Sequence, residues 1–598
     1  MKARFFSYTM AAVCLAALSA LMPSCKKYLE VQPISSFGPD YVFNSVVNAR
    51  TAVLGAYASL GGDNGYGIRL SMYYPYDSDD MMGQGGTPYP DNERRDIAHY
   101  SLNSGNTQLA APFNQLYQGV ERANLCIYYI PKMDLYANGT ANEQKELKRL
   151  HGEALTLRAQ FYFELVRNWG DLPAQWQPST FETDLFKPKM SRDSIYLHLL
   201  DDLKTAENLV PWRTEVAADE RITQGAVRAL RARIALFAGG YSLRQDRTLK
   251  RVANYKDFYQ IAKDECAAVM ARRDQHKLNA TYQAVFKDVI DAHRIDPAGE
   301  VVFEVAMTGG SSSSGDSKLG YYNGPLYSTM SGTTTTNLGN AALTILPTYF
   351  YTFDSTDTRR DVTCAPYNNF SDGTKRGRAL QSIVDGKFRR DWITNPVVLT
   401  SQAQYFGLNW PLIRFSDVLL MYAEADNELS NGPTTAAKNA FEEVRTRAYG
   451  NASLIGTTPT AYTDFFNALV KERQLEFGGE GIRKYDLIRW NLLAQRLTDA
   501  KAALTALSNR QGAYANLPAN MYYKNSSADL VWLNSFYKPA PVTTAPAGYT
   551  SVAWAGTAVN TTILTYYAVG FTTGKSELLP IPQASLDANP LLKQDYGY

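Results

Sequence analysis

The sequence lacks the patterns that mark an enzyme, a metal site or a nucleic-acid-binding surface. Its five histidines stand in no ligand spacing such as HExxH. It has no P-loop, no GxGxxG after a strand and no GxSxG elbow. The 60 Lys and Arg residues are balanced by 58 Asp and Glu, so a formal net charge of +2 gives no electrostatic reason to bind nucleic acid. We therefore predict no catalytic residue, no metal, no cofactor and no nucleic-acid partner.

Cysteine is scarce, with five residues in 598. Beyond the N-terminal segment only Cys126, Cys266 and Cys364 remain, far apart and without CxxC spacing. Such spacing makes neither a zinc site nor a disulfide framework. We expect Cys126 and Cys266 to be buried in helices as small hydrophobic residues. The alternative is that two of the three cysteines form one disulfide, as exported proteins allow.

Long hydrophobic runs are absent after the N-terminus, because no later segment has the 18 or more apolar residues of a membrane-spanning helix. At the N-terminus, Lys2 and Arg4 precede an apolar stretch at 9–22, and Pro-Ser then leads into Cys25. This order resembles a bacterial lipoprotein signal. We predict a signal peptide at 1–24 and lipid attachment at Cys25, since acyl chains contribute about 0.8 kcal/mol per buried methylene. An ordinary secretory signal with an incidental Cys25 is the alternative.

Helical periodicity dominates the rest of the chain. Apolar residues recur at three- and four-residue spacing through about 40–60, 111–272 and 409–495. The helices come in pairs of roughly 34 residues that resemble degenerate tetratricopeptide repeats, which bury their faces by stacking into a superhelix. Within them, Ser191 is predicted to cap one helix, and Ser416 or Asp417 is predicted to cap another.

Two stretches interrupt this pattern. The segments at about 61–105 and 297–405 are rich in Gly, Asn, Thr and Tyr and are predicted to be loops, apart from a strand at 301–305. Beyond about residue 500 the chain is predicted to be loop-like to its end at 598. In the first loop, the run DSDD at 77–80 lacks the Gly and Glu of an EF-hand, so we assign it to loop hydrogen bonds. A calcium-binding site elsewhere in the loops is the alternative that the sequence leaves undecided.

Charged residues cluster around the last predicted helices. The spacing of Glu472, Glu476 and Glu480 is compatible with the paired carboxylates of a glycosidase. The neighbouring arginines, however, would hold these carboxylates ionised, which does not suit a general acid. We therefore predict a buried structural charge network. Its members are Arg414, Glu424, Arg473, Glu476, Glu480, Arg483 and Asp486.

Six stretches of this sequence together resemble the SusD/RagB family of Bacteroidetes outer-membrane lipoproteins. They are Cys25 with KKYLE; LYQGVERAN at 116–124; GEALTLRAQFYFELVRNWGDLP at 152–173; IRFSDVLLMYAEADNEL at 413–429; ERQLEFGGEGIRKYDLIRW at 472–490; and LLPIPQASLDANPLLKQDYGY at 578–598. They occur in the family's order. Asp417 departs from the pattern, because the family more often has Glu there.

The resemblance implies a mainly α-helical fold. It would be a superhelix of about four tetratricopeptide-like helix pairs, with a loop-rich, largely irregular ligand-binding portion that contains short strands. All of 25–598 would form one such domain. The resemblance also implies a surface-exposed lipoprotein of the outer membrane that binds glycan and delivers it to a SusC-like TonB-dependent transporter.

The ligand surface of the family lies on the loop-rich side, and this chain has 40 Tyr. A tyrosine ring stacks on the apolar face of a sugar, and its hydroxyl can bond at the rim. The predicted ligand-binding residues are Tyr66, Tyr73, Tyr74, Tyr76 and Tyr89 in the first loop, and Tyr321, Tyr322, Asn323 and Tyr327 in the second. The alternative for each tyrosine is packing under its own loop.

These observations predict a non-enzymatic lipoprotein that captures an oligosaccharide. Three alternatives remain at this point. The chain could be a peptide-binding member of the same family, a secreted glycoside hydrolase, or a structural repeat protein that recruits other proteins.

Overall fold

A computed structural model describes residues 38–84, 93–217, 220–309, 312–395, 398–399, 401–526, 529–555, 559 and 561–598. The predicted signal peptide, Cys25 and Tyr89 lie outside the described residues. The mainly α-helical fold predicted from the sequence is confirmed. In the described ranges, none of the helices combines the length and the apolar character needed to cross a membrane.

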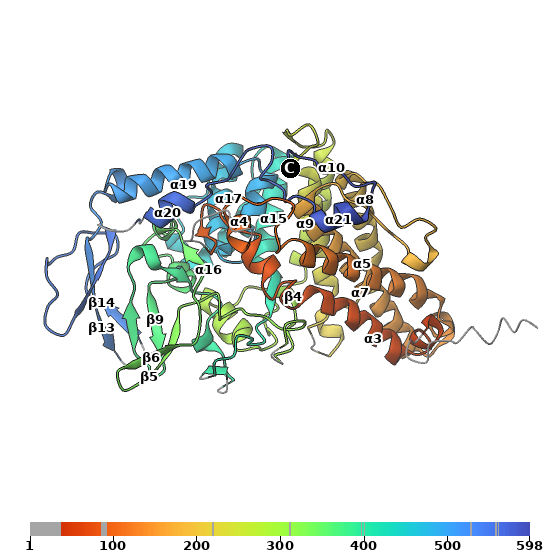
Figure 1. The fold of residues 1–598 in the computed structure, drawn as a ribbon, viewed down its shortest axis with the longest axis horizontal. Coiled ribbons are helices and arrows are strands. Elements are labelled where there is room, and N and C mark those ends of the chain that lie inside the picture. The colour runs from red at the N-terminus through yellow and green to blue at the C-terminus, as the bar shows by residue number, and fades with distance from the viewer. Residues whose placement is uncertain are drawn as a thin grey trace, which may run out of the picture.

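The helices on the right of Figure 1 stack side by side. In chain order they are α2 (Pro39–Val42), α3 (Val46–Tyr57), α5 (Ala110–Tyr129), α6 (Asp134–Asn138), α7 (Ala141–Trp169), α8 (Arg192–Ala206), α9 (Gln224–Gly239) and α10 (Tyr255–Met270). From α5 onward each long helix packs on the next, as stacked helix pairs require. The stack then continues from α10 to α15 (Phe415–Ser430), which follows the second predicted insertion.

The helix ends follow from local chemistry. Thr140 and Glu143 form a capping box at the start of α7, and the Ser191 hydroxyl accepts a hydrogen bond from the Ser194 backbone N–H, as predicted for α8. Gly119 lets α5 approach α7, because a Cβ atom there would lie 2.5 Å from the Phe161 ring.

The cap predicted for α15 is wrong. The helix begins at Phe415 with Arg414 at the N-cap position, and no side chain caps it. Ser416 and Asp417 are fully buried inside its first turn. The Asp417 carboxylate bonds instead to Arg473 and Arg233, because two guanidinium groups hold a buried carboxylate more strongly than backbone N–H groups do.

The remaining helices follow α15 in the chain or are short. They are α16 (Thr435–Tyr449), α17 (Tyr462–Phe477), α18 (Arg483–Arg489) and α19 (Leu493–Ser508), with the short helices α4 (Arg94–Ala98), α11 (Tyr282–Ala284), α12 (Pro347–Phe350), α13 (Arg359–Thr363), α20 (Thr561–Tyr566) and α21 (Gln583–Ala588) elsewhere. Both α16 and α17 pack on α15.

Most of the strands labelled in Figure 1 lie in the irregular part on its left, whereas β4 lies nearer the helix stack. The predicted strand is confirmed as β4 (Val301–Val305), which pairs antiparallel with β12 (Trp410–Arg414) directly before α15. A second sheet has the order β10 (Lys375–Gly377), β9 (Tyr367–Phe370), β5 (Tyr327–Ser331), β6 (Thr334–Asn337). A third has the order β1 (Met81–Met82), β7 (Thr344–Ile345), β11 (Val384–Asp385), β8 (Cys364–Ala365). A two-stranded ribbon joins β2 (Ser242–Leu243) and β3 (Leu249–Lys250).

The prediction of a loop-like chain beyond residue 500 is wrong in part. Helix α19 runs to Ser508, since its alanine-rich sequence favours a helix. A three-stranded sheet follows, in the order β14 (Asp529–Trp532), β13 (Asn520–Ser526), β15 (Thr550–Ala553). The last residues then return to the helix stack, where the Trp169 indole N–H donates to the Pro580 carbonyl at 3.0 Å.

The three cysteines of the described residues are buried and free. Burial raises the pKa of the Cys126 thiol to about 12, so this group behaves as an inert apolar side chain.

Candidate functional site

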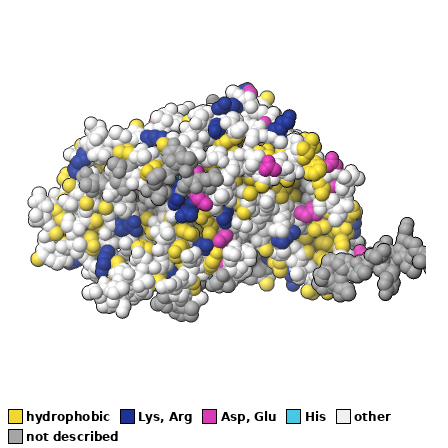
Figure 2. Space-filling view, viewed as in Figure 1, with side chains coloured by type: hydrophobic (Ala, Val, Ile, Leu, Met, Phe, Trp, Pro, Cys, Tyr) yellow, Lys and Arg dark blue, Asp and Glu magenta, His cyan; other side chains and the backbone are white. Residues whose placement is uncertain are grey.

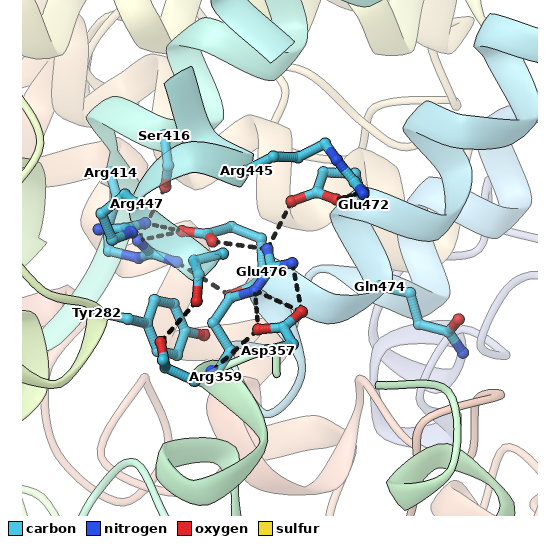
Figure 3. A network of polar contacts seen from close by, with 12 residues as sticks. Tyr282, Asp357, Arg359, Arg414, Ser416, Arg445, Arg447, Glu472, Gln474 and Glu476 are labelled. Carbon is cyan, nitrogen blue, oxygen red and sulfur yellow. Dashed lines mark hydrogen bonds and ion pairs between the residues drawn. The ribbon is translucent and has the colours of Figure 1, made fainter. Parts of the chain in front are cut away.

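A buried charge network joins the end of the helix stack to the irregular part. It contains five cations and five carboxylates: Arg359, Lys387, Arg414, Arg445 and Arg447 with Glu300, Asp357, Glu472, Glu476 and Glu480. Glu476 lies at its centre and pairs with Arg447 at 2.5 Å, Arg414 at 2.9 Å and Arg359 at 3.1 Å (Figure 3). Equal numbers of opposite charges let the group be buried without a net charge.

The electrostatics of Glu476 do not suit acid catalysis. Burial alone would raise its pKa, but Arg447, Arg414 and Arg359 outweigh burial and hold the pKa of Glu476 well below its usual range. The side chain is also completely buried. A carboxylate that stays ionised and cannot reach a substrate is a structural group.

A second buried network runs beside the first. It alternates in sign through Glu424, Arg489, Asp486, Arg473, Asp417 and Arg233. The seven residues predicted as one network therefore belong to different groups. Arg414, Glu476 and Glu480 are in the first network, and Glu424, Arg473 and Asp486 are in the second. Arg483 is in neither network and pairs with Asp79 at 2.7 Å. The ring of Phe477 lies 5.0 Å from the Arg414 guanidinium and 4.9 Å from that of Arg473, between the two networks.

The structure corrects the prediction for three tyrosines of the first loop. Tyr66, Tyr74 and Tyr76 are at most 2% exposed. Their hydroxyls donate to the Glu164 carboxylate, to the Gln108 carbonyl at 3.0 Å and to the Gly479 carbonyl at 3.2 Å. Asn323 is buried to the same degree. These side chains are core residues with no face open to a ligand.

The two predicted insertions dock on each other. The Asp63 N–H donates to the Ser313 carbonyl at 2.8 Å, and the Lys318 N–H donates to the Gly67 carbonyl at 3.0 Å. Glycine permits this approach at two positions, because a Cβ atom on Gly62 would lie 2.6 Å from the Ser313 carbonyl oxygen and one on Gly67 would lie 2.4 Å from that of Asp316. We call the surface along this contact the junction face.

Two of the predicted tyrosines meet on the junction face, and a third is buried near them. The rings of Tyr321 and Tyr322 are half-buried and pack edge to face, with centroids 5.1 Å apart. Tyr73 is buried, with 8% of its surface exposed, and its pKa is raised first by burial and then by the charge of Tyr322. The charges of Arg94, Arg69 and Lys318 oppose this rise in pKa.

Polar side chains from both insertions frame these rings. Lys318 pairs with Asp63 at 3.3 Å and lies 4.8 Å from the centre of the Tyr405 ring. The Tyr405 hydroxyl donates to Asp63 at 3.0 Å, and the Arg69 guanidinium donates to the Asp63 carbonyl at 2.8 Å. Half-buried charged side chains of this kind can bond to ligand hydroxyls while their geometry is fixed by one another.

Hydroxyl bonding divides the predicted tyrosines into two groups. Among the described residues, the hydroxyls of Tyr73, Tyr321, Tyr322 and Tyr327 have no hydrogen-bond partner, whereas those of Tyr66, Tyr74 and Tyr76 each have one. A free hydroxyl beside an apolar ring face is what a sugar-binding surface requires.

Tyr327 does not join the junction face. It lines a groove of about 850 Å³ between the β9 sheet, the turn at Arg390–Trp392 and β14. We call it the sheet groove. Its wall includes Tyr367, Asn369, Trp392 and Trp532, none of which was predicted. Arg390 lies beside Tyr327, with its guanidinium carbon 5.9 Å from the centre of the ring, and burial lowers the pKa of Arg390 to about 10.

The sequence held partial signals for the residues that were missed. YNNF at 367–370 alternates aromatic and amide side chains, and RRDW at 389–392 places a tryptophan after two arginines. Both are compositions of a binding surface. Lys318, Arg69 and Tyr405 stand in no motif, so their assembly around Asp63 depends on the docking of the two insertions.

The acidic run at 77–80 makes the predicted loop hydrogen bonds through Asp77 and Asp80, whereas Asp79 pairs with a helix outside the loop. Asp77 accepts the Gly83 N–H at 2.8 Å, Asp80 accepts the Met81 N–H at 2.8 Å, and Asp79 pairs with Arg483. Within the described ranges, no three His, Cys, Asp or Glu side chains are placed to hold a metal ion.

The sequence is similar to two protein-family models and to curated proteins. Residues 299–598 match the family model described as "SusD family", and residues 27–236 match one described as "Starch-binding associating with outer membrane". SusD-like protein P25 of Formosa agariphila is 23% identical over 513 residues, which are 80% of this chain and 89% of that protein.

Solved structures share the fold along nearly the whole length. A SusD homolog from Bacteroides thetaiotaomicron has a TM-score of 0.74 at 22% identity, and the match covers 93% of this chain and 98% of that one. Surface glycan-binding protein A from the same organism, solved in complex with laminarihexaose, has a TM-score of 0.64 at 18% identity and covers 92% and 99%.

Proposed function

The chain belongs to the SusD family, and on this premise we propose that it captures an oligosaccharide on the junction face. The observation that carries the proposal is the pair of Tyr321 and Tyr322, whose rings are half-buried and whose hydroxyls are unbonded within the described structure, on a surface where two separate insertions meet. Sugar rings would stack on the half-exposed aromatic faces, and Lys318 and Asp63 would bond to their hydroxyls.

We also propose that the protein holds this ligand at the outer membrane. The family description of residues 27–236 and the lipoprotein-like sequence before Cys25 support attachment there through an acylated Cys25, facing the cell exterior. Delivery to a SusC-like TonB-dependent transporter is the partner role that the family resemblance implies.

The proposed function includes no chemical step. The carboxylates that could be mistaken for a glycosidase pair, Glu472, Glu476 and Glu480, are buried and occupied by cations. A glycosidase needs a carboxylic acid and a carboxylate on opposite sides of an accessible sugar bond. These three groups therefore support binding without hydrolysis.

A glycan array followed by calorimetry tests the proposal. The purified mature chain is expected to bind at least one oligosaccharide, and Tyr321→Ala with Tyr322→Ala is expected to weaken that binding about tenfold or more, at roughly 0.5–1.5 kcal/mol for each lost stacking contact. Tyr41→Ala is the matched control, since Tyr41 is 52% exposed on α2, outside the junction face. It should leave the affinity unchanged.

Other results would favour the alternatives. Released reducing ends on a polysaccharide panel would indicate a hydrolase. Stabilisation against heat by peptides but not by glycans would indicate the peptide-binding branch, because a ligand raises stability by RT ln(1 + [L]/Kd). Unchanged glycan affinity in the double tyrosine variant would exclude the junction face as the site.

A further inference from the structure

The sheet groove is a concave surface whose lining residues are all different from those of the junction face. Its volume of about 850 Å³ falls within the roughly 300–1,000 Å³ of ligand sites in proteins. Its walls come from segments far apart in the sequence: β9, the turn at Arg390–Trp392 and β14. The groove is thus formed by the fold rather than by one loop.

Asn369 on its wall is an unsatisfied polar group. The side chain is 3% exposed, and neither its Oδ1 nor its Nδ2 atom has a hydrogen-bond partner among the described residues. A buried polar group left unpaired costs about 1–3 kcal/mol. The indole N–H groups of Trp392 and Trp532, which line the same groove and are half-buried, are also unbonded within the described structure. The groove is therefore lined by hydrogen-bond donors and one acceptor, the Asn369 Oδ1 atom, that have no partner among the described residues.

Arg389 is fixed in place at the groove. Its guanidinium is paired with Asp391 at 2.8 Å and donates to the Tyr367 hydroxyl at 2.8 Å. It lies 4.0 Å from the centre of the Trp392 ring. A cation held in this way keeps its donors in a constant geometry for a ligand.

Two lysines are less constrained. Lys375 pairs at 2.7 Å with Asp529, whose side chain is 82% exposed. Lys287 is exposed and has no ion pair or hydrogen bond in the described structure. Both lysines lie close enough to Asp529 to lower the pKa of its carboxyl. Exposed ion pairs contribute about 0–1 kcal/mol, so a ligand anion can replace the Asp529 carboxylate on Lys375.

The net charge of the groove wall favours an anion. Its cations are Lys287, Arg360, Lys375 and Arg389, and its carboxylates are Asp361, Asp391 and Asp529. Asp361 and Asp391 are occupied by the arginines beside them, which leaves two lysines and one exposed carboxylate to face a ligand. The irregular part on the left of Figure 2 likewise presents more Lys and Arg than Asp and Glu.

We propose that the sheet groove is a second saccharide site, selective for an oligosaccharide that carries an anionic group, either a uronate carboxylate or a sulfate ester. Lys287 and Lys375 bind the anionic group, while Asn369 and the indole N–H groups bind ring hydroxyls. The inference rests on the proposed function only in taking the ligand to be a saccharide. It places the charged ligand away from Tyr321 and Tyr322.

Calorimetry on the full mature chain tests the proposal with three probes. Trigalacturonate carries carboxylates, a carrageenan tetrasaccharide carries sulfates, and laminarihexaose is neutral. Lys287→Gln is expected to weaken binding of the anionic probe about threefold, and Asp529→Asn is expected to tighten it about threefold, because each changes one partly screened charge. Both effects should shrink in about 0.5 M salt. Lys256→Gln, at an exposed position on α10, is the matched control.

Opposite shifts for the two substitutions, seen with a carboxylate or a sulfate probe and not with laminarihexaose, would support the site and identify the anionic group. Retention of anionic binding in the Tyr321→Ala/Tyr322→Ala variant would establish that the groove acts independently of the junction face. The proposal is overturned if neither anionic probe binds, or if the tyrosine variant abolishes anionic binding while Lys287→Gln and Asp529→Asn leave it unchanged. Because Lys287→Gln and Asp529→Asn leave the junction face intact, failure of the groove would not be mistaken for failure of the proposed function.

Discussion

Glu476→Gln should destabilise the protein strongly while keeping the shape of the side chain. The substitution leaves five cations facing four carboxylates in a network where Glu476 itself is completely buried. Arg359, Arg414 and Arg447 each lose one charged partner. Breaking a buried ion pair by removing one member costs about 3–5 kcal/mol, because the remaining charge stays buried without compensation.

The assay is guanidinium denaturation followed by tryptophan fluorescence, with a surface pair as the control. Arg273 and Glu443 form a two-pronged pair at 2.8 and 2.9 Å, but their side chains are 44% and 35% exposed. Glu443→Gln should therefore cost less than about 1 kcal/mol. If Glu476→Gln is no more destabilising than Glu443→Gln, the reasoning from charge balance is refuted.

A double-mutant cycle separates charge balance from lost contacts. Arg447→Gln alone leaves four cations and five carboxylates, while Arg447→Gln with Glu476→Gln restores four of each. The double variant should lose less stability than the sum of the two single variants, by about 1–3 kcal/mol. Strict additivity would contradict a coupled network.

The same carboxylate predicts a pH dependence. The pKa of Glu476 is lower in the folded protein than in the unfolded chain, where it is about 4.3. Its contribution to stability is therefore present above about pH 4.3 and is lost as the pH falls toward the folded-state pKa. Glu476→Gln should show a shallower loss of stability below about pH 4 than the wild-type protein, measured by denaturation at each pH.

Three further substitutions test packing and burial. Gly119→Ala should lower the free energy of unfolding by about 1–3 kcal/mol, because its Cβ would lie 2.5 Å from the Phe161 ring. Gly55→Ala in α3 should raise it by about 0.5–1 kcal/mol, because a Cβ there would have nothing within 4 Å. Thermal denaturation of the two variants compares these effects. Burial lowers the pKa of Lys484 to about 7, from about 10.4 in the unfolded chain. Between these values the unfolded state binds one more proton than the folded state, so the wild-type protein loses stability as the pH falls from about 10 to 7. Lys484→Met removes this loss and should therefore raise the free energy of unfolding near pH 6. The gain should shrink as the pH rises from 7 to about 10, and a gain that does not change with pH would contradict this explanation.

Periodicity and capping were sufficient to predict the helix stack. Ser191 caps α8 as predicted, and α7 ends directly before Gly170, which has a φ of 81° that favours glycine. The same reasoning failed at Asp417, because two arginines from α9 and α17 compete for its carboxylate. A local rule does not include partners that are distant in the sequence.

The ligand face was only partly predictable, for a similar reason. Tyr73 and Tyr74 are neighbours in the sequence, yet the Tyr74 hydroxyl donates to a carbonyl and that of Tyr73 has no bond in the described structure. Which of two adjacent tyrosines finds a buried acceptor depends on the tertiary contacts of the loop. Trp392 and Trp532 reach one groove from segments that no periodicity relates.

The charge-balanced network has a consequence for redesign of this protein. Its members span Glu300 beside β4, Arg359 on α13, Arg447 on α16 and Glu476 on α17, and none of the ten belongs to the junction face. Libraries of loop variants could therefore change the residues of the junction face without changing any member of the charge network. A fragment cut anywhere between residues 300 and 480 would instead separate members of the network, so the irregular part should not be expressed as an independent module.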